Sequence, residues 1–334
     1  MKRIFWIFPA FLFLACKSNN IPDVSSVNVQ LSVKRFDKDF FAIDTNQVVV
    51  GLDKLEKTYP AFLKDYLYNI LALTPPVDSA ALHVKSFIKD YRPVFDTAQR
   101  VFSDLTKTTE DIKKGFQFVK YYFPDYRLPT QVITFIGPLE GYANVLTSEG
   151  IAVGLQLYLG SQYSVYQSDY ISQVYPAYQS RRFEPAYIPV NCLKNIIDDL
   201  YPGAGPDQPL IYQMIEEGKK LYLLDHFLPY TDDSLKTGYT ARQLKGCYEN
   251  EGMIWNYFLQ SHLLYATDPA LTREYMNDGP KTEALGEASP GFIGQFVGWQ
   301  IVKKYMQLFP DKKLPDLLAT SAKDIFEVSK YKPR

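Results

Sequence analysis

The sequence predicts an α+β fold that is rich in helix and has one small, mainly antiparallel sheet in the middle of the chain. Three observations lead to this prediction. Apolar residues recur at helical spacing up to about residue 128. Short apolar runs with strand character follow between 131 and 157, and further helical stretches, divided by loops with proline and glycine, continue to the end. Helices placed before and after one block of strands are typical of the α+β class.

The first fifteen residues have the pattern of a signal peptide. A basic pair, Lys2-Arg3, precedes an uncharged apolar run over 4–14, which ends at Ala15-Cys16. At about 1.5 Å per residue, this run covers roughly 16 Å, whereas a bilayer core measures ~30 Å. We therefore expect the segment to be removed and not to span a membrane.

A small residue directly before a cysteine, at the end of such a run, resembles the lipobox of bacterial lipoproteins. This resemblance implies that residues 1–15 are a signal peptide, that Cys16 is lipidated, and that 16–30 form a polar tether. Two or more acyl chains would hold the protein stably on a membrane. The alternative is an ordinary signal peptide that is cleaved elsewhere, with Cys16 at this position by chance.

Composition excludes several classes of partner. The chain has 36 basic and 37 acidic residues without charged blocks, which argues against nucleic-acid binding and against a polybasic membrane surface. With 26 tyrosines and 22 phenylalanines, aromatic side chains are in excess, and they supply core volume and contact surface. Only three cysteines occur, one of them at the lipid site, so the chain is not a disulfide-framework protein.

Region 31–334 is long enough for one large domain or two closely packed ones, with a substantial core. We expect a single domain, with a helical first part at 31–128 and a sheet with helices at 129–334. Expected helices of the first part are 55–73 with a new turn opening at Pro60, 79–90, 94–103, and one that carries an apolar stripe and ends at Pro124. Expected strands are 131–136, 143–147 and 151–157, with a hairpin turn at 148–150. Expected later helices are 187–200, 208–227, 240–260, 290–308 and 321–330.

Three glycines mark the helix expected over 290–308. Ser289 is a candidate N-cap and Pro290 fits the first helical position, after which Gly291, Gly294 and Gly298 fall on one face. Three glycines inside a helix cost about 2–3 kcal/mol in helix propensity. We therefore expect the sheet or another helix to approach this face closely, with a bound ligand as the alternative.

Several segments resemble one family. They are VKRFDKDFF at 33–41, KYYFPDY at 120–126, YENEGMIWNYF at 248–258, SPGFIGQFVGWQIVKKYM at 289–306 and IFEVSKYKPR at 325–334. In this order they resemble the GldB family of gliding-motility lipoproteins of Bacteroidota, from about residue 33 to the C-terminus. The resemblance implies an anchored accessory of the motility and protein-secretion machinery, with other envelope proteins as partners.

The order of sheet and helices also resembles, more distantly, the layout of zincin-type peptidases. In those enzymes one helix carries H-E-x-x-H, with two zinc-binding histidines and a glutamate that activates water. If 187–200 corresponds to that helix, the motif positions hold Asn191, Cys192 and Asn195, which cannot supply this chemistry. The resemblance further implies that 187–200 packs against 240–260. Glu251 would then lie near the two asparagines and Cys247 near Cys192, which would allow a disulfide or leave two buried thiols.

Other catalytic or metal-binding patterns are missing from the sequence. His83, His226 and His262 are isolated, so each is interpreted as a surface or structural residue, and no metal or cofactor is expected. No C-x-x-C, P-loop, G-x-S-x-G or dinucleotide-binding fingerprint occurs. The adjacent carboxylate pairs are expected on solvated helix faces or at helix caps, because neighbouring helical residues point about 100° apart.

Three functional classes remain after these exclusions. The first is a non-enzymatic assembly lipoprotein on a degenerate peptidase-like scaffold. The second is a periplasmic hydrolase with an unrecognised site. The third is a ligand- or glycan-binding lipoprotein, for which exposed Trp255, Trp299 and Tyr257 in a groove would be the sign, although each fits a core position. Residues 17–20 (KSNN) lack the acidic cluster that resembles the surface-export signal of Bacteroidota lipoproteins, which favours a membrane-anchored protein that faces the periplasm.

Overall fold

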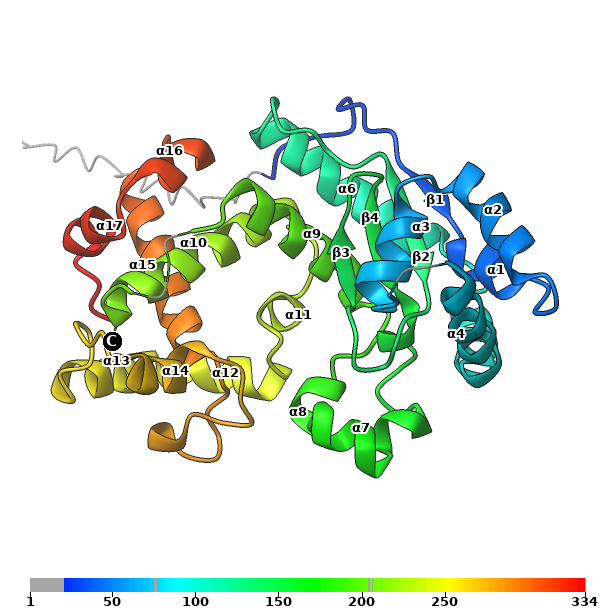
Figure 1. The fold of residues 1–334 in the computed structure, drawn as a ribbon. Coiled ribbons are helices and arrows are strands. Elements are labelled where there is room, and N and C mark those ends of the chain that lie inside the picture. The colour runs from blue at the N-terminus through cyan, green and yellow to red at the C-terminus, as the bar shows by residue number, and fades with distance from the viewer. Residues whose placement is uncertain (1–20, 75–76, 204, 206, 334) are drawn as a thin grey trace, which may run out of the picture.

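The first part of the chain wraps helices around a small sheet (Figure 1). This computed structural model describes residues 21–74, 77–203, 205 and 207–333. The signal peptide predicted at 1–15 and the lipid site predicted at Cys16 lie outside the described residues. Elements before residue 123 are β1 (Ser32–Lys34), α1 (Phe36–Phe41), α2 (Val48–Thr58), α3 (Phe62–Lys64), the π-helical η1 (Asp65–Ile70), α4 (Val77–Asp90), α5 (Arg92–Val101) and α6 (Thr106–Tyr122).

Four short strands form one mixed sheet in the order β1-β2-β4-β3, where β2 is Gln131–Phe135, β3 is Asn144–Leu146 and β4 is Ile151–Gly154. β1 runs parallel to β2, with Val33 opposite Val132, and β2 runs parallel to β4, with Ile133 opposite Ala152. β3 and β4 form the antiparallel hairpin that the sequence predicts. The prediction of a mainly antiparallel sheet is wrong.

Two features explain this error. β1 has three residues, too few to show the alternation that identifies a strand in a sequence. β2 and β4 are buried along nearly their whole length, as is typical of strands inside a parallel sheet with both faces covered. Their connection, which includes β3, brings the chain back so that β4 runs in the direction of β2.

Aromatic rings fill the core beside the sheet. The Phe36 ring contacts those of Tyr59, Phe62 and Tyr66 edge to face, with centroids 5.0, 4.9 and 4.7 Å apart. Such pairs add about 0.5–1.5 kcal/mol each beyond the apolar area they bury. The Tyr66 hydroxyl donates to the carbonyl of Ile136 at 2.7 Å, so this buried phenol keeps a hydrogen bond.

A buried carboxylate joins the start of the chain to the sheet. Asp37 is fully buried and accepts two hydrogen bonds from Arg35, at 2.9 and 2.7 Å. It also accepts from Gln99 at 2.9 Å and from the Thr134 hydroxyl of β2 at 2.5 Å. With four donors around it, the carboxylate is fully satisfied and links α1, α5 and β2.

Part of the predicted tether belongs to the fold. Val24 and Val29 are buried in the cluster of apolar side chains around the sheet, which we call the first core, and Gln117 of α6 donates to the carbonyl of Val27 at 2.9 Å. The tether expected over 16–30 is therefore not free along its whole length.

The second part of the chain is helical. Its elements are η2 (Leu155–Leu157), η3 (Ser164–Gln167), α7 (Asp169–Val174), α8 (Ala177–Ser180), α9 (Tyr187–Leu200), α10 (Leu210–Phe227), α11 (Asp233–Thr237), α12 (Ala241–Glu249), α13 (Glu251–Gln260), α14 (Pro269–Met276), η4 (Glu283–Leu285), α15 (Ile293–Leu308), α16 (Leu314–Ala319) and α17 (Ala322–Ser329). Buried side chains form two clusters, the first core around the sheet and α9 and a second core around α12 to α17. α10 supplies residues to both, with Leu223, Leu224 and Phe227 in the first cluster and Leu210, Ile211 and Met214 in the second.

α10 and α15 cross at very close range, and glycines allow the crossing. A Cβ atom on Gly298 would lie 1.6 Å from the Met214 carbonyl oxygen, and one on Gly218 would lie 2.2 Å from the carbonyl carbon of Gly298. Gly294, one turn earlier, lies against the Met276 sulfur and the backbone of α14. Gly291 does not share this helix face, because it precedes α15 and packs on the backbone of Gly279.

Several boundaries differ from the sequence expectations. The helix expected over 55–73 is divided, because α2 ends at Thr58 and α3 with η1 covers Phe62–Ile70, and the strand expected over 151–157 ends at Gly154. α15 begins at Ile293 and not at Pro290, because Phe292 has a left-handed φ of 56° and the Ser289 hydroxyl bonds to the carbonyls of Thr282 and Gly286. The helix expected over 240–260 is divided into α12 and α13 at Asn250, whose side-chain amide donates to the carbonyl of Gly246 at 2.8 Å. Asparagine side chains favour such local bonds over helix continuation. The expected bounds 187–200 agree with α9.

Candidate functional site

Residues at the degenerate motif positions take part in local packing. Asn191 of α9 donates to the Tyr158 hydroxyl at 2.8 Å, and that hydroxyl donates to Asn144 of β3. The Asn144 amide donates to the Cys192 sulfur at 3.2 Å. Burial raises the pKa of the Cys192 thiol to about 12, so it stays protonated. The Asn195 side-chain oxygen is buried and has no hydrogen-bond partner among the described residues.

The structure does not bring α9 and α12–α13 together. α9 packs against α6, α10, α11 and β3, whereas α12 packs against α11 and α13. Cys192 belongs to the first core and Cys247 to the second, and both are free thiols, so the disulfide does not form. Glu251 accepts a hydrogen bond from the Tyr331 hydroxyl at 2.6 Å, and no bond joins it to Asn191 or Asn195. The zincin-like layout therefore has no support, because α10 and α11 occupy the space beside α9.

Aromatic candidates for a glycan site are mostly core residues. Trp299 is 0% and Trp255 5% exposed. Tyr257 is partly exposed, and its hydroxyl bonds to that of Tyr275 at 2.8 Å. The flat, exposed indole surface that would mark a sugar site is not provided by either tryptophan.

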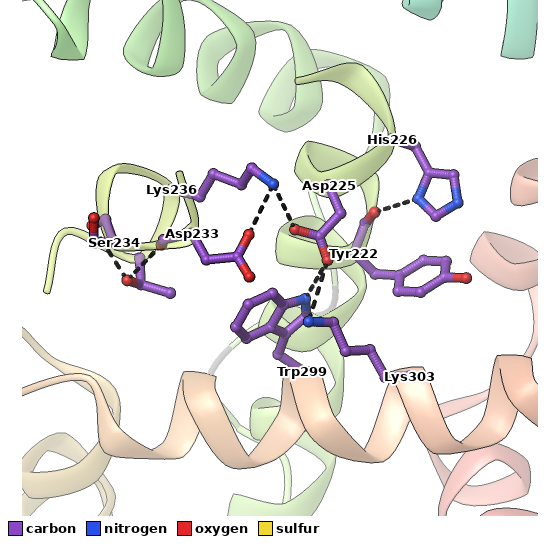
Figure 2. A network of polar contacts seen from close by, with 9 residues as sticks. Tyr222, Asp225, His226, Asp233, Ser234, Lys236, Trp299 and Lys303 are labelled. Carbon is purple, nitrogen blue, oxygen red and sulfur yellow. Dashed lines mark hydrogen bonds and ion pairs between the residues drawn. The ribbon is translucent and has the colours of Figure 1, made fainter. Parts of the chain in front are cut away.

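A polar network ties three helices together (Figure 2). The Asp225 carboxylate of α10 accepts from Lys236 of α11 at 3.1 Å and from the Trp299 indole of α15 at 2.7 Å. Lys303 lies 3.6 Å from the same carboxylate and its ammonium is 3.2 Å from the centre of the Trp299 ring. Asp233 holds Lys236 from the other side at 2.9 Å. Two carboxylates and two lysines balance in charge, so the network fixes α11 against α10 and α15.

His226 lies at the edge of this network and shows no catalytic geometry. Its Nδ1 is 2.8 Å from the Tyr222 carbonyl oxygen, and its ring packs between those of Tyr122 and Tyr222. Burial lowers the pKa of His226, while Asp225 acts in the opposite direction. Within the residues that the structure describes, no group of three histidine, cysteine, aspartate or glutamate side chains could hold a metal ion.

A surface groove of about 670 Å³ runs along α13, and we call it the α13 groove. Its lining residues are Glu249, Asn250, Gly252, Met253, Asn256, Tyr257, Gln260 and Pro333. Another hollow, between the sheet and α6, holds only about 10 Å³, about the room for one water molecule. Of these two hollows, only the α13 groove could receive a ligand or a segment of another protein.

The walls of the α13 groove are anchored to the second core. Tyr331, two residues before Pro333, is 7% exposed, and its ring lies edge to face on Trp255 with centroids 5.1 Å apart. Its hydroxyl bonds to Glu251 at the start of α13. Tyr248, directly before Glu249, packs on the Trp299 ring, with centroids 6.4 Å apart. Residues next to the α13 groove are thus held by contacts to Glu251, Trp255 and Trp299.

A family model described as "Gliding motility protein GldB" matches residues 17–333. The chain belongs to the GldB family. No curated protein matches the chain, and neither does any solved structure. Family membership means that the protein is a gliding-motility-related lipoprotein. None of the helices in the described part of the chain has both the length and the apolar character required to cross a bilayer.

Two of the segments that resemble the family meet at the α13 groove. The segment YENEGMIWNYF supplies six of the lining residues, between Glu249 and Tyr257, and IFEVSKYKPR supplies Pro333. The sequence interpretation did not single out this surface as a site. The sequence pattern that could have indicated this surface is the spacing of Met253, Asn256 and Gln260. This spacing places three exposed side chains on one face of a helix whose other face is buried.

Proposed function

We propose that the protein is a non-enzymatic envelope lipoprotein that assists the gliding and protein-secretion machinery by binding another envelope protein. It is anchored through a lipid on Cys16 and faces the periplasm. The family match over 17–333, which begins directly after Cys16, carries this proposal. The α13 groove supplies a surface for partner binding, because segments that resemble the family form it.

The chemistry of α9 supports a role without catalysis. The buried Cys192 thiol has a raised pKa, and the Asn191 amide is engaged with Tyr158, so neither side chain offers a nucleophile or a base. A hydrolase would need other residues. A peptidase assay with metal analysis of the purified protein tests that alternative, and turnover together with one tightly bound metal per chain would establish it.

Gene deletion tests the accessory role. In a gliding member of the Bacteroidota that carries this protein, deletion should abolish spreading on agar or reduce the load of secreted proteins, and the wild-type gene should restore both. Normal spreading and normal secretion in the deletion strain would contradict the proposal. A pull-down of crosslinked partners from membranes should recover envelope proteins from the wild-type strain and not from the deletion strain.

A further inference from the structure

We infer that one face of the domain lies against the bilayer that holds the lipid on Cys16. This surface, which we call the α6 face, consists of Lys114, Gln117 and Tyr121 of α6 together with Tyr230 and Ile21. The inference rests on the proposed function, because it requires the lipid anchor. The length of the tether, the place where it docks and the aromatic side chains around that place lead to the assignment.

The tether from the lipid to the domain is short. Val24 is fully buried in the first core, so the chain is fixed to the domain from this residue onward. Val24 follows Cys16 by eight positions (24 − 16), and eight residues span at most about 29 Å. A compact domain of about 300 residues measures roughly 50 Å across. Because the tether is shorter than the domain is wide, the bilayer lies nearest to the side where the tether docks.

The tether docks along α6. Gln117 donates to the carbonyl of Val27 at 2.9 Å, which fixes the segment after Val24 to the middle of this helix. Hydrogen bonds from Ser25 lower the pKa of the Asp23 carboxyl, and the nearby Lys114 ammonium adds to this effect. The blue start of the described chain and α6 both lie in the upper part of Figure 1, whereas α13 lies in the lower part. The α6 face, and not the α13 groove, is therefore the side held near the membrane.

Exposed tyrosines border the place where the tether docks. Lys114, Phe118 and Tyr121 follow one another at helical spacing on one face of α6. The Lys114 ammonium lies 5.6 Å from the centre of the Phe118 ring, and the Tyr230 ring packs against Phe118 with centroids 6.3 Å apart. Tyr230 is 71% and Tyr121 49% exposed. A tyrosine has an apolar ring and a polar tip, and such side chains are enriched where lipid headgroups meet hydrocarbon.

The α6 face sets the orientation of the domain and is not needed for attachment. Two or more acyl chains on Cys16 hold a protein stably on a membrane. Lys114 has the Asp23 carboxylate nearby, and the chain as a whole has 36 basic and 37 acidic residues without charged blocks, so charge contributes little to binding. With the α6 face on the bilayer, the α13 groove is directed away from the lipid and stays accessible to an envelope partner.

Fluorescence quenching on vesicles tests the orientation. The lipidated protein is labelled with a fluorophore at an introduced cysteine and inserted into preformed vesicles of phosphatidylethanolamine and phosphatidylglycerol that contain a headgroup-spin-labelled lipid. A label at Lys113→Cys, an exposed position of α6 next to Lys114, should be quenched at least threefold more strongly than a label at Met253→Cys on α13. Cys192 and Cys247 are buried, and the unsubstituted protein measures any labelling of these two thiols.

Substitution of the tyrosines tests whether their side chains contact the lipid. With the label at Lys113→Cys, Tyr121→Ser/Tyr230→Ser should reduce the quenching at least twofold, because the face then loses its two interfacial rings. The matched control is Tyr142→Ser/Tyr170→Ser, which removes two phenols of similar exposure, 55% and 60%, from the β2–β3 connection and from α7. This control should leave the quenching unchanged. Equal melting temperatures of all variants confirm that they are folded.

Several outcomes would overturn the inference. They are equal quenching at the two label positions, stronger quenching on α13, quenching at neither position, or no effect of the substitutions at Tyr121 and Tyr230. These results can be separated from a failure of the anchor. If the purified protein carries no lipid and does not bind the vesicles, the anchor of the proposed function and the orientation fail together. If the protein is anchored but shows one of the four results above, only the orientation fails.

Discussion

Lys330 adopts a left-handed backbone conformation directly after α17, with φ and ψ both 44°. A residue with a Cβ atom costs about 1–2 kcal/mol in this conformation, whereas glycine adopts it freely. Lysine at this exposed position therefore reduces the stability of the turn that leads to Tyr331 and the α13 groove.

We expect Lys330→Gly to raise the free energy of unfolding by about 0.5–1 kcal/mol, because glycine is the preferred residue at such a helix end. The matched control is Glu327→Gly, at an exposed position inside α17. This substitution should lower the free energy of unfolding by about 0.5–1 kcal/mol. Thermal unfolding followed by circular dichroism measures both. A lower melting temperature for Lys330→Gly would show that its side chain makes a contact worth more than the strain.

His226 makes stability depend on pH. Its folded-state pKa is lowered by burial, so the unfolded chain, with a histidine pKa near ~6.5, binds the proton at a higher pH than the folded chain does. The unfolded state therefore holds more protons, and the free energy of unfolding falls as pH drops below about 6.5.

Urea unfolding between pH 8 and pH 5 should show this loss, and His226→Gln should reduce the slope, since glutamine does not titrate. Asp225 raises the pKa of His226, whereas Lys236 and Lys303 lower it, and the wild type and the variant both keep these three residues. Equal slopes for wild type and variant would assign the pH dependence to other groups.

At the scale of helices, the chain shows which features a sequence reveals. α9 and α10 are long runs rich in apolar residues, and their expected bounds agree with the structure to within two residues. β1 is too short for a pattern, and the break at Asn250 depends on a single side-chain bond. Side-chain hydrogen bonds and the pairing of distant strands depend on the folded structure, so they cannot be predicted from the spacing of hydrophobic residues in the sequence.

The α10–α15 crossing makes Gly298 intolerant of a side chain. Gly298→Ala would place a methyl group 1.6 Å from the Met214 carbonyl oxygen, so the two helices must separate. We expect a loss of at least about 3 kcal/mol in the free energy of unfolding, as in a strongly overpacked core.

Gly246→Ala is the control, because a Cβ atom there meets nothing within 4 Å, inside the helix α12. It should raise stability by about 0.5–1 kcal/mol. Unfolding of both variants by denaturant measures the two changes in the free energy of unfolding. A soluble Gly298→Ala protein with wild-type stability would show that the crossing can relax.

Asp225 joins three helices, and its removal should have a larger effect than that of a surface charge. Asp225→Asn leaves Lys236 and Lys303 without their shared carboxylate, although Lys303 is partly exposed. We expect a loss of about 2–3 kcal/mol in urea unfolding.

Asp111→Asn removes a carboxylate from the exposed pair with Lys107 and should change stability by less than about 0.5 kcal/mol. Equal effects of the two substitutions would mean that the Asp225 network does not stabilise the position of α11.

At the scale of the whole molecule, the sequence predicts the class of protein better than its binding surface. The family segments and the predicted lipid site lead to an envelope lipoprotein, and the family match supports the lipoprotein and gliding-motility class. The expected remnant of a peptidase site lacks support, because helix order alone does not determine which helices touch. The α13 groove joins residues 249–260 to Pro333, which are distant in the chain and meet only in the folded protein.

Membrane attachment should depend on residue 16. Cys16→Ala should leave an unprocessed precursor or release the protein into the soluble fraction, whereas Cys192→Ala and Cys247→Ala should remain membrane-bound, because both thiols are buried. Cell fractionation with immunoblotting measures the distribution. A Cys16→Ala protein that stays on the membrane at its mature size would contradict lipid anchoring.

The last described residues of the chain, Tyr331 to Pro333, pack beside α13, and this matters for how the protein is handled. Tyr331 is fixed to Glu251 and Trp255, and Pro333 contributes to the α13 groove. An affinity tag or fluorescent fusion added after Pro333 would follow a residue that lines the α13 groove, and it would compete with the proposed partner there. The opposite terminus is the one that we propose to be processed at Cys16, so it is also unsuited to a tag. A reporter therefore belongs in an exposed internal turn, and a loss of motility in a strain with a C-terminal fusion should not be attributed to misfolding.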